Sequence, residues 1–407
     1  MHDTQTRPTH RIDTDELPPR PAENSAQSAA HRAAAEIPAG ATGVIIIDLA
    51  QIRANWRALA RYVAPAECAA VVKADAYGLG AALIIPALLD AGCRTFFVAT
   101  LEEARSARAL APGAVIFILD GLLPQTEEDV ASLCAIPILS CLDEVRAWAA
   151  LDKNAASAPP AALHIDTGLN RLGMCAADVV QLARDTALLR RLNLALVMSH
   201  LACADDAAHP MNQEQLDTFT RTRASLPPAR ASLAASDGLM LGRAFHFDLV
   251  RPGYALYGGQ AAPQRVTPVH PVVHVSARIL QVHDVAAGGR IGYSASYRAD
   301  TPRRIATIAA GYADGIFRHA SATNDASGGA VLIRGKRAPI VGRVSMDLIT
   351  VDVTDLDNPA PARGDWADLV APELPIESVG AAAGTIGYEV LTRLGSRFHR
   401  VYLDQGD

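Results

Sequence analysis

Short apolar runs alternate with amphipathic stretches through the first two thirds of the chain. Residues 44–47 form a β-branched run, and residues 49–62 place apolar side chains at helical spacing. Further runs are apolar without alternation, as expected of parallel strands covered on both faces. They are 69–72, 95–99, 115–119, 136–140, 162–165, 194–198, 231–235 and 247–250. Helical periodicity lies between most of them, at 81–91, 101–110, 176–189 and 212–225. This series predicts a closed (β/α)₈ barrel of the TIM type, with a doubly wound open sheet as the alternative.

The pattern changes near residue 260, where strand-like runs follow one another with few helices between them. These runs are 272–285, 304–309, 331–333, 338–344, 348–353, 366–370 and 401–403, and helical signal returns at 376–383 and 388–394. We therefore predict an α/β barrel over residues 44–259 and a mostly β C-terminal domain over 260–407. The first strand, 44–48, is a candidate to pair with the second domain.

Residues 1–43 differ from both predicted domains. Besides Met1, the only large aliphatic residues before position 37 are Ile12 and Leu17, and four prolines interrupt any helix. Such a segment buries too little apolar surface to offset the entropy of ordering it. We predict a disordered N-terminal tail, which lacks the apolar core of a signal peptide.

Composition narrows the class of protein. The chain has 407 residues, of which 50% are hydrophobic and 20% charged, and this is typical of a globular protein. Its net charge of −6 disfavours nucleic-acid binding, and no apolar run approaches the ~18 residues of a membrane span. The six cysteines form no C-x-x-C pair, which favours reduced thiols in a cytoplasmic protein. We expect no metal site.

Polar residues follow the predicted barrel strands at their carboxyl ends, where barrels carry their sites. Each has an ordinary structural explanation taken singly, such as a solvated lysine, a packed histidine or a helix cap. Together they suggest a phosphate-bearing cofactor, because barrels bind phosphate after strands seven and eight, and a strand-end lysine can hold pyridoxal phosphate as a Schiff base. They are Lys73, His164, Asp166, Arg171, His200, Ser236, Asp237, Arg251, Gly253 and Tyr254.

Several motifs resemble those of alanine racemases, in order and across both predicted domains. The segment 72–80, VKADAYGLG, resembles the pyridoxal-phosphate signature of that family. The others are DTG at 166–168 with RLG at 171–173, SH at 199–200, VRPG at 250–253, GYSASY at 292–297, GYADG at 311–315, VGRVSMD at 341–347 and GYEV at 387–390. The resemblance extends from about residue 44 to the C-terminus.

The resemblance implies a pyridoxal-phosphate enzyme that interconverts L- and D-alanine. It also implies a homodimer in which each active site is completed by the other subunit. Lys73 would carry the cofactor, and Arg251 would face its pyridine nitrogen. Arg171 would contact the ring hydroxyl, and the Met346 backbone would help to position the substrate carboxylate in the partner's site. The phosphate would be held by Tyr77, Ser236, the amides of Gly253 and Tyr254, and Tyr388.

Racemisation needs a proton removed on one face and returned on the other, so two bases are the simplest solution. By resemblance these are Lys73 and Tyr293 of the second subunit. A free tyrosine titrates near pH ~10, so Tyr293 needs help to act as a base at neutrality. In this family a histidine linked to the ring-facing arginine gives that help, which corresponds to His200 and Arg251.

The sequence also departs from the family. His164 stands where many members carry a carbamylated lysine that orients the arginine corresponding to Arg171. Asp75, Leu79 and Ser345 replace a usual asparagine, histidine and cysteine. The change at His164 leaves a broader amino-acid racemase, acting for example on serine, as an alternative. A pyridoxal-phosphate decarboxylase and a non-catalytic cofactor-binding module are further alternatives, and the second domain with Tyr293 argues against both. The D-alanine product would feed cell-wall peptidoglycan, or the enzyme would serve catabolism.

Overall fold

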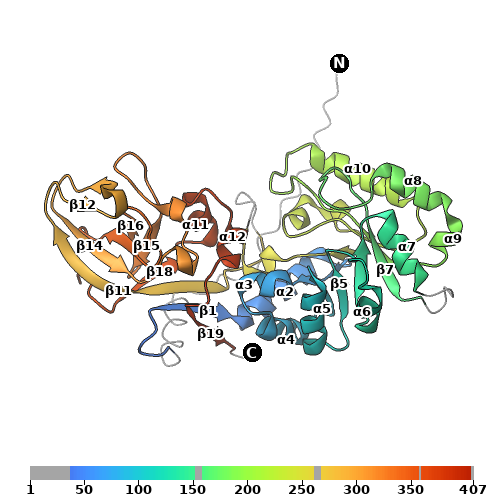
Figure 1. The fold of residues 1–407 in the computed structure, drawn as a ribbon, viewed down its shortest axis with the longest axis horizontal. Coiled ribbons are helices and arrows are strands. Elements are labelled where there is room, and N and C mark those ends of the chain that lie inside the picture. The colour runs from blue at the N-terminus through green and yellow to red at the C-terminus, as the bar shows by residue number, and fades with distance from the viewer. Residues whose placement is uncertain (1–36, 152–157, 261–266, 357–358, 405–407) are drawn as a thin grey trace, which may run out of the picture.

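The computed structural model describes residues 37–151, 158–260, 267–356 and 359–404. Two domains lie side by side along its long axis, a barrel and a mostly β domain (Figure 1). The predicted fold class, an α/β barrel followed by a mostly β domain, is confirmed. The predicted tail falls mostly on residues 1–36, which lie outside the described residues.

The barrel is a ring of short parallel strands. Strands β3 to β9 pair in sequence order, and β2 pairs with β10. The amide of Arg251 donates to the Ala234 carbonyl at 3.0 Å, so the β10 edge joins the β9 edge and the ring closes. This excludes the open sheet. The strands are β2 (Glu67–Cys68), β3 (Ala70–Val71), β4 (Thr95–Val98), β5 (Val115–Ile118), β6 (Ile136–Leu139), β7 (Pro160–His164), β8 (Asn193–Met198), β9 (Arg230–Ser232) and β10 (Leu249–Val250).

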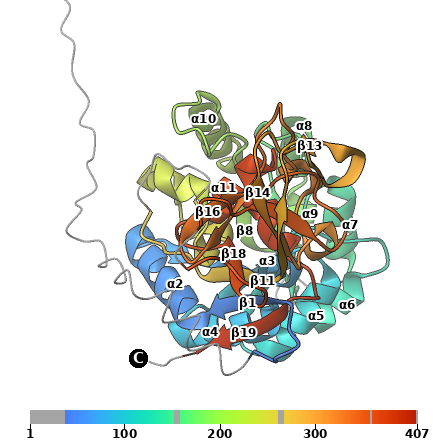
Figure 2. The same ribbon diagram turned by 90° about the vertical axis from the view of Figure 1, so that its left-hand side faces the viewer.

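Helices cover the outside of this ring, as the end-on view shows (Figure 2). They are α2 (Leu49–Val63), α4 (Ala81–Ala91), α5 (Leu101–Leu110), α6 (Glu127–Ser132), α7 (Leu142–Ala150), α8 (Ala176–Arg184), α9 (Thr186–Leu189) and α10 (Met211–Arg223). Local sequence defines the start of α2, because the Asp48 carboxylate accepts a hydrogen bond from the Gln51 amide at 2.8 Å. Among the described residues, none of the helices combines the length and apolarity that a membrane span requires.

The second domain is built on a sheet that the long, bent strand β11 (Val273–Val285) organises. Its other strands are β1 (Gly43–Asp48), β14 (Arg303–Ile308), β15 (Ala330–Ile333), β16 (Lys336–Pro339), β17 (Ile349–Asp352), β18 (Trp366–Val370) and β19 (His399–Leu403). A small hairpin, β12 (Arg290–Ile291) with β13 (Tyr297–Arg298), lies at the end of the domain away from the barrel (Figure 1). Helices α11 (Ile376–Ala382) and α12 (Gly387–Thr392) complete it.

Strand β1 precedes the barrel in sequence but lies in the sheet of the second domain. It pairs antiparallel with β11 and parallel with β19, so Ile45 lies opposite Val275 on one side and Arg400 on the other. Ile45 and Ile47 are fully buried. From β1 the chain therefore passes out of the second domain, forms the barrel, and then returns.

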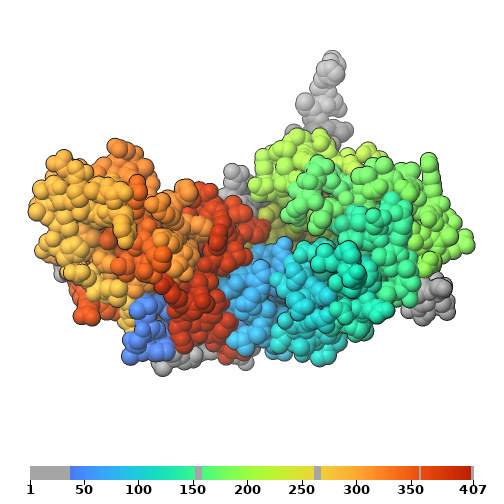
Figure 3. All heavy atoms as spheres, in the orientation of Figure 1, coloured from blue at the N-terminus to red at the C-terminus, as the bar shows by residue number. Residues whose placement is uncertain are grey.

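The C-terminal segments also hold the barrel segment that follows Lys73. Arg400 Nη1 donates to the Gly78 carbonyl at 2.6 Å, and the Tyr402 hydroxyl donates to the Leu79 carbonyl at 3.0 Å. A side chain at Gly78 would place its Cβ 2.9 Å from the Leu391 carbonyl oxygen of α12. In the space-filling view these C-terminal residues, in red, lie between the two domains (Figure 3).

Candidate active site

A left-handed turn begins directly after β3. In α3 (Lys73–Gly78), residues 74–77 all have φ between 53° and 57°. For residues with a side chain this conformation costs roughly 1–2 kcal/mol each, so the surroundings must impose it. The Ala74 amide donates to Glu103 Oε1 at 2.8 Å, and the Ala81 amide donates to Asp75 Oδ1 at 2.7 Å. The turn fixes Lys73 at the barrel mouth and sends Tyr77 into the interior.

Lys73 lies among positive charges. Burial, followed by the charge of Arg171, lowers the pKa of its ammonium group, while Asp120 and Glu103 oppose the shift. A lysine with a lowered pKa is more often a neutral amine near neutrality, and only the neutral amine is a nucleophile or a base. Lys73 therefore has the environment that a reactive lysine requires.

Arg251, which follows β10, is 2% exposed and lies inside the barrel. Its guanidinium donates to Ser232 Oγ, to the Ser199 carbonyl at 2.7 Å and to the Leu233 carbonyl at 3.3 Å. Burial lowers the pKa of Arg251 to about 9, so the group remains charged at neutrality. Its Nη2 also lies 3.4 Å from Nδ1 of His200. The structure thus brings together the arginine and histidine that the sequence linked.

His200 is neutral in the folded protein. Burial and then Arg251 lower the pKa of His200 to about 3. Since the arginine can only donate, Nδ1 of His200 is the acceptor and the ring proton is on Nε2. His200 therefore presents an N–H donor on the side of the ring away from Arg251.

His164, at the end of β7, is 6% exposed, and burial followed by Arg251 lowers the pKa of His164 to about 4. Asp166 does not take over an orienting role toward Arg171, because its Oδ1 accepts from the amides of Gly168 and Asn170 instead. In the described part of the chain no ion pair joins Asp166 to the exposed Arg171.

We expect the two buried histidines to make the fold sensitive to acid. In the unfolded chain their pKa is 6.5, so between pH 6.5 and about 4 the unfolded state binds protons that the folded state does not bind. The free energy of unfolding keeps its full value above pH 6.5 and decreases below it, by about 1.4 kcal/mol per pH unit for each histidine. His164→Gln should reduce this slope by one histidine's share in urea unfolding at several pH values. An unchanged slope would contradict the assignment.

A cradle for an anion lies beside Lys73, between the ends of β9 and β10. Ser236 Oγ is buried and accepts hydrogen bonds from the amides of Gly253 at 3.0 Å and Ala255 at 3.1 Å. Gly253 lies against the Tyr77 ring so closely that a Cβ there would collide with the hydroxyl group. The Tyr77 hydroxyl, Ser236 and the Gly253 backbone thus converge on one place.

Two more tyrosines close this cradle. Tyr254 begins η4 (Tyr254–Tyr257), and its ring stacks on that of Tyr388 from α12 with centroids 3.9 Å apart. The Tyr254 hydroxyl donates to Glu377 at 2.8 Å, and the Tyr388 hydroxyl donates to Asp237 at 2.9 Å. Tyr388 also lies 6.2 Å from the Tyr77 ring, so the second domain supplies one wall of the cradle.

Tyr293 and Met346 are not at this barrel mouth. Tyr293 is 71% exposed and lies between β12 and β13, at the end of the second domain away from the barrel (Figure 1). Met346 is 53% exposed, and its carbonyl accepts from the Ala313 amide at 3.0 Å. Gly292 and Gly342 lie in contact, since a Cβ on Gly292 would come 3.3 Å from the Gly342 Cα. Three of the four motifs of this domain, all but the one that contains Tyr388, therefore gather on one exposed face.

An ionic network fixes that face. Asp314 is 4% exposed and accepts from Arg397 Nε at 2.7 Å and from Arg397 Nη2 at 2.6 Å. Arg397 Nη1 donates to Asp347, next to Met346, at 2.6 Å. The two carboxylates raise the pKa of the Arg397 guanidinium, so the bridge is charged at any working pH.

The sequence interpretation missed several positioning residues. Glu103 holds the left-handed turn from α5, and Arg397 joins two motif loops. Gln215 on α10 is fully buried and binds Thr167, the His200 carbonyl and the Ala202 amide, so it ties together the loops after β7 and β8. A buried glutamine on an otherwise amphipathic helix was the one signal that could have indicated such a role.

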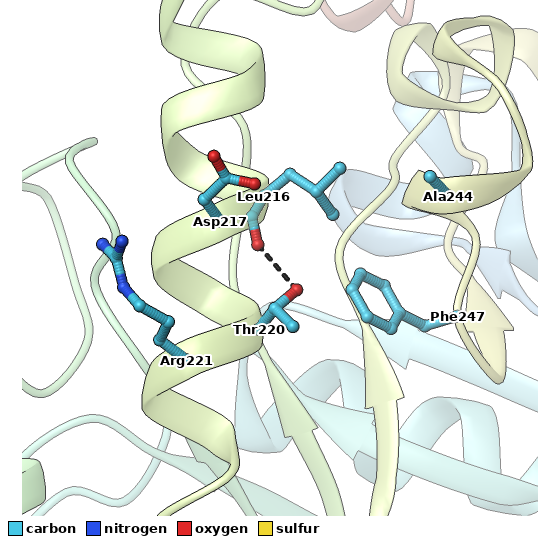
Figure 4. Close-up of a pocket in the computed structure, with 6 residues that line it drawn as sticks. All are labelled: Leu216, Asp217, Thr220, Arg221, Ala244 and Phe247. Carbon is cyan, nitrogen blue, oxygen red and sulfur yellow. Dashed lines mark hydrogen bonds between the residues drawn. The ribbon is translucent and has the colours of Figure 1, made fainter.

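A separate pocket of about 430 Å³ opens between α10 and the segment before β10 (Figure 4). Its lining residues are Leu216, Asp217, Thr220, Arg221, Ala244 and Phe247. Phe247 stands at the amino end of β10, whereas the residues described above stand at carboxyl ends. This pocket is therefore not part of the candidate active site.

Comparison with known sequences is unambiguous in both domains. Residues 47–261 match the family described as "Alanine racemase, N-terminal domain", and residues 272–402 match "Alanine racemase, C-terminal domain". An alanine racemase of Methylobacterium nodulans is 46% identical over 360 residues, which cover 88% of this chain and 96% of the relative. An alanine racemase of Brucella abortus is 44% identical over 377 residues, covering 89% and 94%.

Solved structures agree with these matches. The crystal structure of alanine racemase from Bartonella henselae with covalently bound pyridoxal phosphate has a TM-score of 0.85 and 43% identity, covering 89% of this chain and all of that one. The biosynthetic alanine racemase of Pseudomonas aeruginosa has a TM-score of 0.82 and 33% identity, with the same coverage.

Proposed function

The chain belongs to the alanine racemase family, and on that premise we propose that Lys73 holds pyridoxal phosphate at the barrel mouth while Tyr293 of a second subunit supplies the opposite base. The activity is the interconversion of L- and D-alanine. The observation that carries the assignment is the position of Lys73, whose pKa is lowered by burial and by Arg171.

The residues of the cradle fit the cofactor. Gly253 approaches the Tyr77 hydroxyl so closely that a side chain there would fill the cradle, and the surrounding groups are hydrogen-bond donors and acceptors. Tyr77, Ser236, the amides of Gly253 and Tyr254, and Tyr388 would hold the phosphate. Arg251 would face the pyridine nitrogen, because its charged group lies inside the barrel beside His200. Bound in this way, pyridoxal phosphate would supply an electron sink that acidifies the Cα–H bond of the amino acid.

The two bases divide the proton transfers between opposite faces of the substrate. The Lys73 amine, kept partly neutral by its surroundings, takes the proton on its face at Nζ. The Tyr293 phenol oxygen gives or takes the proton on the other face. Arg171 and the Met346 backbone would hold the substrate carboxylate between them.

His200 explains how a tyrosine serves as a base at neutrality. Its Nδ1 faces Arg251, so its Nε2–H is free to donate toward a phenolate oxygen that approaches the mouth. A hydrogen bond to the charged form of a tyrosine lowers its pKa. His200 remains neutral throughout, since the pKa of His200 is about 3.

The exposed position of Tyr293 supports a homodimer. Within one subunit the β12–β13 hairpin that carries it lies at the end of the second domain away from the barrel, so Tyr293 would reach a Lys73 only in another subunit (Figure 1). Two-fold symmetry would then give two equivalent sites, each built from both chains. We further propose that the enzyme acts in the cytoplasm and that its D-alanine enters peptidoglycan.

Arg397 should affect substrate binding without affecting cofactor binding. Arg397→Met removes the bridge that holds the Met346 loop, and we expect the KM for alanine to rise about tenfold, since misplaced positioning groups have effects of this order. The affinity for pyridoxal phosphate should stay unchanged in cofactor titrations, because Asp314 and Asp347, which Arg397 binds, are not residues of the cradle. The matched control is Arg393→Met, which removes only an exposed contact with Glu389. Equal effects of both changes would contradict the prediction.

His164 bears on the substrate range, because a histidine cannot form a carbamate that would orient Arg171. A racemase restricted to alanine should turn over alanine far faster than serine or lysine, and comparable rates would favour the broader racemase.

Borohydride reduction followed by peptide mapping tests the cofactor assignment. The reduced protein should carry one pyridoxyl group per chain, on Lys73. A label on any other residue would overturn the proposed site. Lys73→Ala serves as the control and should remain unlabelled.

A further inference from the structure

The proposed phosphate cradle also contains a carboxylate. Asp237 begins η2 (Asp237–Leu241) directly after Ser236, and its Oδ2 accepts the hydrogen bond of the Tyr388 hydroxyl at 2.9 Å. A carboxylate so close to a bound phosphate is unexpected, because two anions side by side repel each other. This carboxylate also accepts the hydrogen bond of Tyr388, which we assign to phosphate binding.

The Tyr388 hydroxyl has a single proton to donate. While that proton is directed to Asp237, Tyr388 offers only lone pairs to a phosphate oxygen. The ring itself has little freedom to turn away, because it stacks on Tyr254 at 3.9 Å and 18°. Tyr254 in turn lies against Gly259 and Gly387, at each of which a Cβ would collide with it.

The titratable groups that the described residues bring near Asp237 are tyrosines and one further carboxylate. Tyr77 from α3, Tyr254 from η4 and Tyr388 from α12 surround it, and Glu377 from α11 accepts from Tyr254. Burial, and after it the charge of Asp237, raises the pKa of Tyr77 and of Tyr388, so both remain protonated. Glu377 adds a second negative charge at the same end of the site.

We propose that Asp237 competes with the cofactor phosphate for the Tyr388 proton, so that tight binding of the cofactor requires the uptake of one proton by Asp237. The proton comes from solvent and adds to the carboxylate, after which the Tyr388 hydroxyl turns its own proton toward the phosphate. The O–H bond formed on Asp237, with the proton given up by the solvent, is the only covalent change. The proposal rests on the proposed function and adds to it a cofactor affinity that decreases as pH rises, because binding takes up a proton.

The experiment compares two cofactor forms on full-length protein freed of cofactor with hydroxylamine. Pyridoxal phosphate or pyridoxal is titrated in at a series of pH values. Because Lys73 reacts with both compounds, the affinity for pyridoxal phosphate divided by that for pyridoxal measures the contribution of the phosphate group alone. Asp237→Asn should raise this ratio about tenfold at neutral pH, which corresponds to one pKa unit of coupling. It should also flatten the dependence of the ratio on pH. The charge control is Glu128→Gln on the exposed face of α6.

A double-mutant cycle separates proton competition from simple repulsion. Tyr388→Phe alone should lower the ratio of the two affinities only slightly, because the Tyr388 hydroxyl already donates its proton to Asp237. The same change in an Asp237→Ala protein should lower this ratio several-fold more, because in that protein the Tyr388 hydroxyl donates its hydrogen bond to the phosphate. Equal effects in the two backgrounds, or an unchanged ratio in Asp237→Asn, would overturn the inference while leaving Lys73 as the cofactor site. Failure of the wild-type protein to bind pyridoxal phosphate at all would instead overturn the proposed function.

Discussion

Mixing a Lys73→Ala chain with a Tyr293→Phe chain should restore racemase activity that neither variant has alone. Each homodimer lacks one base in both sites, and loss of a general base lowers turnover by roughly 10²–10⁴-fold. In the mixed dimer one site has lost both bases, whereas the other combines the intact Lys73 of one chain with the intact Tyr293 of the other. Random reassociation in equal amounts should therefore recover about a quarter of the wild-type activity, since half of the dimers are mixed and each has one good site.

The measurement is D-alanine formation after the two purified variants exchange subunits. Tyr293→Phe should still bind pyridoxal phosphate with wild-type affinity, because Tyr293 lies outside the cradle, so loss of activity is not loss of cofactor. The control is Tyr312→Phe, another exposed tyrosine of the same face, which should be active alone and should give about half of the wild-type activity in an equal mixture with Lys73→Ala, since its own dimers keep both sites. If the mixture stayed as inactive as its components, the two bases would belong to one chain and the shared site would be wrong.

The second large effect is expected at Arg251. Arg251→Glu replaces a buried cation by an anion at the place proposed for the pyridine nitrogen. A glutamate there keeps the ring nitrogen protonated, whereas a guanidinium does not. The stronger electron sink should increase transamination, while racemisation falls by roughly 10²-fold or more because the charge that holds His200 neutral is also lost. The change in product partition is measured as pyridoxamine phosphate formed per alanine racemised.

Arg251→Gln separates the two consequences. It removes the cation without providing an acidic partner, so racemisation should fall while transamination stays low. If Arg251→Glu left the partition unchanged, the proposed contact with the ring nitrogen would be wrong. Both variants need a fold check by circular dichroism, because Arg251 is 2% exposed and hydrogen-bonded to the barrel.

Most of the regular structure could be predicted from local sequence. Helices α4 and α5 occupy the residues that periodicity indicated, since Gly80 and Gly92 flank one and Thr100 caps the other. The barrel strands were found because parallel strands buried on both faces are uniformly apolar. Lys73 stands out as the candidate cofactor lysine because it ends such a strand.

The left-handed turn after Lys73 could not be predicted. Alanine and aspartate at 74–76 favour right-handed helix or ordinary loop, and the conformation is imposed by Glu103 from α5 and by Arg400 and Leu391 from the second domain. The same holds for the contact of Asp237 with Tyr388, which joins residues 151 positions apart. Tertiary contacts decide such features, and no local pattern contains them.

The placement of β1 between β11 and β19 has a consequence for the synthesis of the protein. Residues 43–48 are synthesised before the barrel, whereas both neighbours of this strand, β11 and β19, are synthesised after it. Until then the nascent chain exposes a β-branched, apolar edge that is open to wrong pairing. The barrel can fold before the second domain is synthesised, whereas the sheet of the second domain can close only after β19 has been synthesised.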